Sequence, residues 1–244
     1  MSESKRKILV LVEGARTDTR LMERLLAIYN IDAKYEIVSY GTNIYTLYSE
    51  MFAENDPSKV DLLQLLKERE SDPNKKLIFD IAYTDILLIF DLEPHAPDFS
   101  PEKIRRMAEY FVESSDMGKL YLNYPMVEAF YHMSSIPDEQ YNNRFATLEE
   151  LQAGTYKMRV NRENRNHDYS KFAADRDECN IVIQQNIDKA RSITHEEKVP
   201  EYLPGQANIL TAQLALLTEE RKVAVLSICP FFIPDYNPAL IQHE

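Results

Sequence analysis

The sequence predicts an α/β protein in which a parallel sheet flanked by helices is followed by a mainly helical C-terminal region. Short runs of leucine and β-branched residues alternate with amphipathic stretches over the first half of the chain, as is typical of βαβ units. The clearest runs, KILVLV and DILLIF, are apolar throughout, which indicates strands buried on both faces of a parallel sheet. The alternation stops near Ser135, and the stretches beyond it have helical spacing.

Four strands and the helices between them are expected in the first half. Thr17 is a candidate N-cap, Gly41 and Thr42 form a turn, and Ser100-Pro101 places proline at the first position of a helix. The expected strands are Lys7–Val12, Tyr35–Tyr40, Asp85–Phe90 and Lys119–Asn123. The expected helices follow Thr17, span Asn43–Glu54, begin at Asp56-Pro57, run from Ser100 to about Ser114 and begin at Pro125.

A domain boundary is predicted in the segment Ser134–Asn143, which combines Pro137 with the polar run DEQYNN. We therefore expect a first α/β domain over residues 1–135 and a helical accessory domain over residues 136–244. The helices expected in the second domain are Leu148–Gln152, Asp175–Ile193 and Gln206–Leu226.

Composition limits the classes of function. The chain has 244 residues and a formal net charge of −12, which argues against a protein that coats nucleic acid non-specifically, because phosphate binding needs a basic surface. The two cysteines form no CxxC pair, which fits a reducing compartment. No signal peptide or membrane-spanning run is recognised, so a cytoplasmic protein without a membrane partner is expected.

Carboxylates follow two of the expected strands. Glu13 ends the first strand, and Asp91 and Glu93 end the third. Residues i and i+2 of a strand face the same side, and sites in open α/β sheets form at the carboxyl ends of the strands. Converging carboxylates repel one another unless a cation is present, and oxygen ligands suit Mg²⁺ or Mn²⁺. The alternative is that these acids only end strands and cap helices.

The joint pattern resembles the Toprim fold, the catalytic core of topoisomerases, bacterial primases and OLD-family nucleases. In that family a Glu-Gly pair closes the first strand and a D-x-D motif closes a later one. Glu13-Gly14 matches the first element, and Asp91-Leu92-Glu93 matches the second except that Glu93 replaces the usual aspartate. The resemblance implies that Glu13, Asp91 and Glu93 are catalytic residues and metal ligands.

One branch of this family resembles the chain further, over roughly residues 7–135. Small Toprim nuclease effectors of bacterial phage-defence systems (RloB-like, OLD-type and PARIS-type) carry an N-P-x-x-E segment after the fourth strand. Asn123, Pro125 and Glu128 hold those places here, with Tyr124 inserted. The resemblance implies that Glu128 is a fourth metal ligand, and that an ATPase partner and an oligomer are possible.

A basic island interrupts the acidic second half. Residues Tyr156–Lys171 have Tyr156 and Tyr169 available for stacking, and arginine with aromatic side chains suits single-stranded nucleic acid. Arg16 lies near an expected helix N-terminus, where anions bind. The alternative is a solvated charged face. The candidate nucleic-acid-binding residues are Arg16, Lys157, Arg159, Arg162 and Arg165.

The expected function is therefore a Mg²⁺-dependent endonuclease, with Mn²⁺ as a possible substitute, that cuts DNA or RNA as an effector of phage defence. Two alternatives remain open. The first is a non-catalytic Toprim-like scaffold that binds a protein partner or a nucleotide. The second is a primase-type nucleotidyl transferase, although the chain has no zinc-binding motif that would accompany it.

Overall fold

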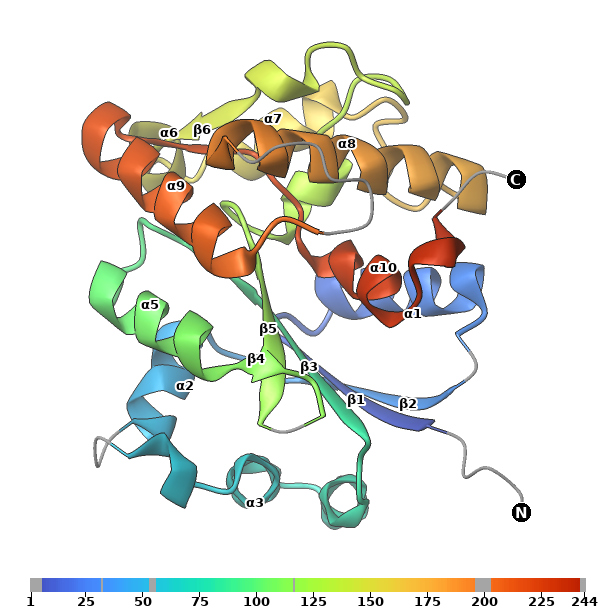
Figure 1. Ribbon diagram of the computed structural model, residues 1–244, viewed down its shortest axis with the longest axis vertical. Coiled ribbons are helices and arrows are strands. Elements are labelled where there is room, and N and C mark those ends of the chain that lie inside the picture. The colour runs from blue at the N-terminus through green and yellow to red at the C-terminus, as the bar shows by residue number, and fades with distance from the viewer. Residues whose placement is uncertain (1–5, 32, 53–55, 116, 196–202, 242–244) are drawn as a thin grey trace.

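The protein is built on a five-stranded sheet in the order β2-β1-β3-β5-β4 (Figure 1). The computed structural model describes residues 6–31, 33–52, 56–115, 117–195 and 203–241. Strands β1, β2, β3 and β5 are parallel, and only the short β4 is antiparallel to its neighbour. The predicted α/β class with a mostly parallel sheet is thus confirmed. The strands are β1 (Arg6–Val12), β2 (Ala33–Ser39), β3 (Asp85–Asp91), β4 (Val112–Glu113) and β5 (Gly118–Asn123).

Helices cover both faces of this sheet. Figure 1 places α1 and α10 on one side and α2, α3 and α5 on the other. The side chains of Asn43, Asp61 and Ser100 cap the N-termini of α2, α3 and α5. The helices of this part are α1 (Thr17–Tyr29), α2 (Ile44–Met51), α3 (Leu62–Arg69), α4 (Pro73–Lys76), α5 (Pro101–Tyr110) and α10 (Phe232–Tyr236).

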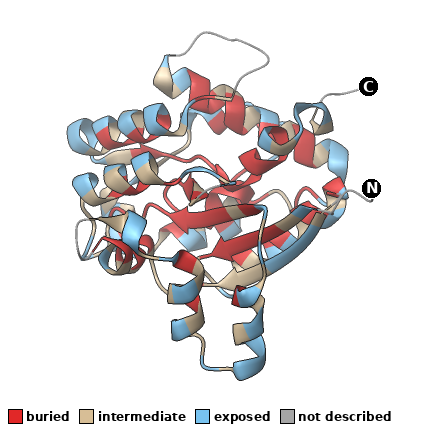
Figure 2. Ribbon diagram, turned by 60° about the horizontal axis from the view of Figure 1, so that its bottom comes forward, coloured by how far each residue is buried: buried red, intermediate tan, exposed pale blue. Residues whose placement is uncertain are grey.

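The central strands are buried because their side chains are apolar on both faces. Val12 is paired in register with Ile89 across β1 and β3, and both are fully buried. Strand β2 lies at the edge and is largely exposed or half-buried. Figure 2 shows the same gradient, with buried central strands and exposed outer helix faces. Continuous apolar runs therefore mark the middle of the sheet, as expected for parallel strands.

The direction of winding reverses between β1 and β3. The chain leaves β1 for β2 on one side, and then returns across β1 to β3 and β5 on the other. Because βαβ crossovers are right-handed, the two directions place their helices on opposite faces. A crevice forms at such a switch point, beyond the carboxyl ends of the two strands. Glu13 and Asp91 lie at these two ends.

The C-terminal region gathers above the sheet in Figure 1 and contains a small antiparallel pair of strands as well as helices. Its chain returns to β5, where Tyr124 and Leu226 exchange two backbone hydrogen bonds of 2.9 and 2.8 Å. The elements are β6 (Phe145–Thr147), α6 (Leu148–Gln152), α7 (Tyr156–Glu163), α8 (Arg176–Thr194), α9 (Gln206–Glu220) and β7 (Lys222–Ala224).

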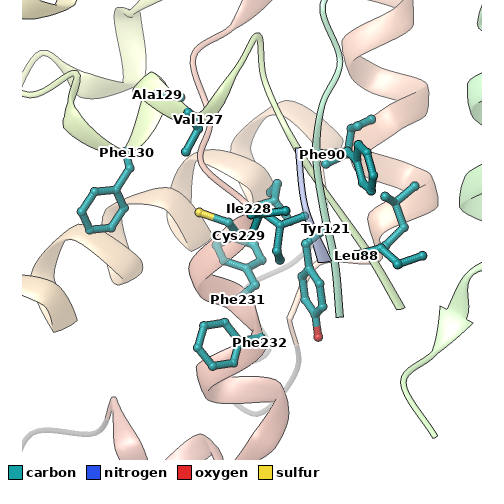
Figure 3. Close-up of a cluster of buried hydrophobic side chains, with 14 of the residues drawn as sticks. Leu88, Phe90, Tyr121, Val127, Ala129, Phe130, Ile228, Cys229, Phe231 and Phe232 are labelled. Atoms are coloured by element: carbon teal, nitrogen blue, oxygen red, sulfur yellow. The ribbon is translucent and has the colours of Figure 1, made fainter. Parts of the chain in front are cut away.

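One hydrophobic cluster joins the two regions. Figure 3 shows Ile228 and Cys229 of the C-terminal segment beside Tyr121 of β5 and Val127. All four side chains are buried in the same cluster. The division into domains at residue 135 stays a prediction, although the two parts share this core. Among the described residues, no helix is long and apolar enough to cross a bilayer.

Several predicted elements differ from the structure. The helix expected from Ser100 to about Ser114 ends at Tyr110, because Val112 and Glu113 form the strand β4. The helix expected over Gln206–Leu226 ends at Glu220, because Arg221 is left-handed and the β-branched run after it pairs with β6. The helix expected at Pro125 is a 3₁₀ segment, η3 (Val127–Tyr131). The helix expected from Asp56 divides into a 3₁₀ turn and α3. Thr17 is the first residue of α1 and not its cap.

The helix predicted over Asn43–Glu54 is present as the shorter α2, which begins after the N-cap Asn43 and ends at Met51 with Phe52 as its C-cap. Its last two predicted residues, Ala53 and Glu54, lie outside the described residues.

Candidate active site

Glu13 and Asp91 meet at the switch point between β1 and β3. The backbone N–H of Glu13 donates to the carbonyl of Ile89 at 3.0 Å, which continues the sheet by one residue. The side chain of Glu13 then turns toward β3, and its Oε2 accepts the backbone N–H of Asp91 at 3.2 Å. Neighbouring parallel strands thus bring together two acids that are 78 residues apart in the chain.

Glu93 joins this pair by a different route from the one the sequence indicated. Strand β3 ends at Asp91, so the alternation of a strand does not orient Glu93. Its φ of +40° places it in the left-handed region, which is uncommon for a residue other than glycine and occurs at functional sites. Its backbone N–H donates to the carbonyl of Pro125 at 3.1 Å, which holds the turn. The charge of Glu93 acts on Glu13.

Two further acids border these three. Glu128 lies in η3 and is only 4% exposed, and its charge acts on Asp91 and on Asp18. Asp18 lies in the first turn of α1, is 6% exposed and acts on both Glu13 and Asp91. Asp18 was not predicted as a site residue from the sequence, because an acid in the first turn of a helix is common. Its position just after Glu13-Gly14 was the available signal.

Lys157 brings the C-terminal region into this group. Its Nζ lies 3.1 Å from Oε1 of Glu128. The helix α7 that carries it is anchored by the buried Tyr156, whose hydroxyl lies 3.2 Å from Nδ1 of the buried His132. Tyr156 is therefore not available for stacking on a base, contrary to the expectation, because it fills the core beneath α7. We call Glu13, Asp18, Asp91, Glu93, Glu128 and Lys157 the acidic cluster.

Burial and mutual repulsion shift the acids of this cluster. Desolvation, and next the charge of Glu93, raises the pKa of Glu13 to about 8. Desolvation in the first place also raises the pKa of Asp18 to about 6. The pKa of Asp91 lies well above its usual range because of burial first and the charge of Glu13 second. The cluster contains five acids and one lysine. Because of the raised pKa values, some of these acids stay protonated near neutral pH.

The oxygens of the cluster fit a hard divalent cation. In the described part of the chain, Oδ1 of Asp18 and Oε2 of Glu128 are buried and accept no hydrogen bond. Buried carboxylate oxygens without partners are unfavourable, and a cation would remove that cost. The ligands are not already assembled, since no three acidic, histidine or cysteine side chains of the described residues stand as a ready metal-binding group. A bound cation would therefore require these side chains to rearrange.

Gly14 lets Asp18 approach the backbone. A Cβ on Gly14 would lie 2.5 Å from Oδ2 of Asp18, closer than real contacts allow. Because the conflicting atom is the end of a side chain that can turn, we expect Gly14→Ala to lower the free energy of unfolding by about 1 kcal/mol, the low end for overpacking, when measured by urea denaturation. In an Asp18→Ala background the same change should cost little. An equal cost in both backgrounds would show that Asp18 is not the side chain in conflict.

The five candidate nucleic-acid-binding residues do not share one environment. Arg165 makes two hydrogen bonds with the carboxylate of Glu178 at 2.7 and 2.8 Å, and Arg159 donates to the carbonyl of Phe145. Arg162 is highly exposed and pairs with Glu163, and Arg16 is exposed at the start of α1. Of these five residues, Lys157 belongs to the acidic cluster, through its ion pair with Glu128. Binding of nucleic acid by these residues stays a prediction.

Comparison of the chain with protein-family models, with curated proteins and with solved structures finds no match in any of the three. The fold and the site together define an α/β protein whose acidic cluster lies at the switch point of a mostly parallel sheet. The assignment of a function therefore depends on the chemistry of that cluster.

Proposed function

We propose that this chain is a metal-dependent nuclease with a Toprim-like fold, which hydrolyses phosphodiester bonds in DNA or RNA. The observation that carries the proposal is the convergence of Glu13, Asp91 and Glu93 at the switch point of the sheet, bordered by Asp18 and Glu128. Acidic side chains are crowded there at a cost in desolvation and repulsion. A bound divalent cation explains why that cost is tolerated.

Four residues would hold the metal: Glu13, Asp91, Glu93 and Glu128. When bound, Mg²⁺ or Mn²⁺ would supply a Lewis acid for the scissile phosphate and lower the pKa of a water molecule. Asp91 would be the central ligand, because it lies between Glu13 and Asn123 at the ends of neighbouring strands. Glu93 and Glu128 approach from the turns that follow β3 and β5.

Glu13 would accept a proton during the reaction, and Lys157 would stabilise negative charge on the phosphate. Oε2 of Glu13 accepts the Asp91 N–H in the metal-free protein. With Oε2 turned from that N–H toward a cation, Oε1 would be left to take the proton of an attacking water. Burial raises the pKa of Glu13 to about 8 in the metal-free protein, and a bound cation would lower it and favour the ionised carboxylate that a base requires. Burial lowers the pKa of Lys157, but the charge of Glu128 outweighs that effect and raises the pKa above its ordinary value. The ammonium group therefore stays charged and suits a phosphate oxygen.

The biological role proposed is an effector of phage defence, controlled by an ATPase partner. It follows from the resemblance of Glu13-Gly14, Asp91-Leu92-Glu93 and Asn123-to-Glu128 to small Toprim effectors. An exposed face of α7 beside the cluster carries Lys157, Met158, Asn161 and Arg162, and these residues offer hydrogen-bond donors and one apolar group to an approaching strand.

A second candidate function is a scaffold that binds a protein or a nucleotide without catalysis. The observation that favours it is that the acids of the described residues do not form a ready metal-binding group. On this account the acids are structural, and Lys157 is their permanent counter-ion.

Thermal unfolding with and without Mn²⁺ separates the two functions. A ligand at a hundred times its Kd stabilises the native state by about 2.7 kcal/mol, which raises the Tm of a chain of this size by about 5–10 °C. The nuclease predicts this rise for wild type and its loss in Asp91→Asn. The exposed Glu102 serves as the control site, and Glu102→Gln should keep the full rise. An equal rise in wild type and Asp91→Asn would place the ion elsewhere.

A further inference from the structure

Asn123 is a fully buried amide that touches the acidic cluster. It is the last residue of β5 and is paired in register with Asp91 on β3. Its Nδ2 donates to Oδ1 of Asp91 at 3.2 Å. The carbonyl of Asn123 also accepts the backbone N–H of Leu92 at 3.0 Å. Side chain and backbone of one residue therefore hold both Asp91 and the turn after it.

The other end of the same amide holds the C-terminal segment. Oδ1 of Asn123 accepts the backbone N–H groups of Ile228 at 3.2 Å and of Cys229 at 3.1 Å. This segment, Ser227–Cys229, lies more than a hundred residues further along the chain and packs beside β5 (Figure 3).

The two acceptor bonds determine the direction of the donor. An asparagine oxygen has two lone pairs, and Ile228 and Cys229 use both of them. The amide is thereby fixed in orientation, and its NH₂ group must point toward Asp91. If Ser227–Cys229 left its place, the amide would be free to turn and the Asp91 carboxylate would lose its buried donor.

We propose that Asn123 is a positioning residue, which orients the Asp91 carboxylate and makes that orientation depend on the docking of Ser227–Cys229. The C-terminal segment thereby becomes part of the site. The inference rests on the proposed function in one respect only, namely that Asp91 ligates a metal. When a residue that hydrogen-bonds to a metal ligand is removed, the affinity for the metal typically falls by about 10–100-fold.

Asn186 provides a matched control. It is also fully buried, and its Oδ1 accepts the backbone N–H of Ser227 at 2.7 Å and the Tyr141 hydroxyl at 2.6 Å. It therefore anchors the same segment with the same kind of bonds, and no hydrogen bond joins it to Asp91 among the described residues. Replacing either asparagine by alanine should lower the Tm.

The first experiment measures Mn²⁺ affinity of the full chain by electron paramagnetic resonance, at a temperature where circular dichroism shows each variant folded. We expect Asn123→Ala to weaken the Kd by about 10–100-fold and Asn186→Ala to weaken it less, because Asn186 reaches Asp91 only through the segment that it anchors. Asn123→Ser, which loses the same contact with less loss of volume, is measured in parallel and should behave like Asn123→Ala. Equal affinities in wild type and in both Asn123 variants would overturn the proposal.

The second experiment needs no metal. Tm shifts are measured in EDTA for Asp91→Ala combined with Asn123→Ala, and for Asp91→Ala combined with Asn186→Ala. Contacting residues give non-additive effects and separated ones give nearly additive effects, so the first pair should deviate from additivity, and by more than the second. If wild type binds no Mn²⁺, the metal-dependent function fails, and this comparison alone decides the link between Asn123 and Asp91. Additive shifts in both pairs would then overturn it.

Discussion

Asp91→Asn is expected to reduce Mg²⁺-dependent cleavage by on the order of a thousandfold or more, because it removes the charge of a direct metal ligand. The assay uses single-stranded DNA, duplex DNA and tRNA, with any activating partner present. The fold should be retained, since the buried Asp91 lies beside other acids that raise its pKa. Asparagine resembles the protonated carboxyl that burial favours at this position in the metal-free protein, so the Tm should hold or rise.

Asp85→Asn is the matched control for this prediction. Asp85 begins the same strand that Asp91 ends, is similarly buried and accepts the Ser114 hydroxyl at 2.9 Å. It lies at the opposite end of the sheet from the acidic cluster, so its replacement should leave cleavage intact. A wild-type protein that is inert on every substrate with its partner, or an Asp91→Asn variant that cuts normally, would refute the nuclease assignment.

Glu13→Gln is expected to change how stability depends on pH. A carboxyl group whose pKa rises from 4.5 unfolded to about 8 folded binds its proton more tightly in the native state. The native state is therefore favoured at low pH, and this contribution is lost as pH rises from about 4.5 to about 8. One unit of pKa corresponds to about 1.4 kcal/mol, so the loss across this window should be roughly 2–5 kcal/mol, since neighbouring charges relax.

Urea unfolding in EDTA at the two ends of this window tests the prediction. The wild-type free energy of unfolding should fall more steeply with pH than that of Glu13→Gln. Glu102→Gln, at an exposed position, should keep the wild-type slope. Saturating Mn²⁺ should flatten the wild-type slope, because the ion compensates the charge that burial penalises. Parallel slopes in wild type and Glu13→Gln would mean that Glu13 is an ordinary solvated carboxylate.

The middle of the sheet was predictable from the sequence, because strands buried on both faces must be apolar throughout. The runs ending at Val12 and Phe90 met this condition, and they pair in parallel as β1 and β3. The adjacency of Glu13 and Asp91 followed from it, since parallel neighbours end at the same edge. Strand β2 is half exposed, and its pattern was correspondingly weaker.

The rest of the site depends on contacts that no local pattern encodes. Glu93 reaches the cluster through a left-handed turn, whereas the strand alternation used to predict it does not extend that far. Lys157 approaches Glu128 because the buried Tyr156, the first residue of α7, anchors that helix, and a run of basic residues gave no sign of that packing. The segment at Leu226 was assigned to a helix for its apolar spacing, but its register with β6 and Tyr124 decides its structure.

A divalent ion located in a crystal soaked with Mn²⁺ would test the central claim most directly. Anomalous scattering identifies manganese independently of the protein density. The account predicts one or two peaks among the carboxylates of Glu13, Asp91, Glu93 and Glu128, with Glu13 rotated away from the Asp91 N–H that its Oε2 now accepts. An ordered, fully ion-free cluster at saturating Mn²⁺, with Glu13 still bonded to that N–H and Lys157 still paired with Glu128, would contradict it.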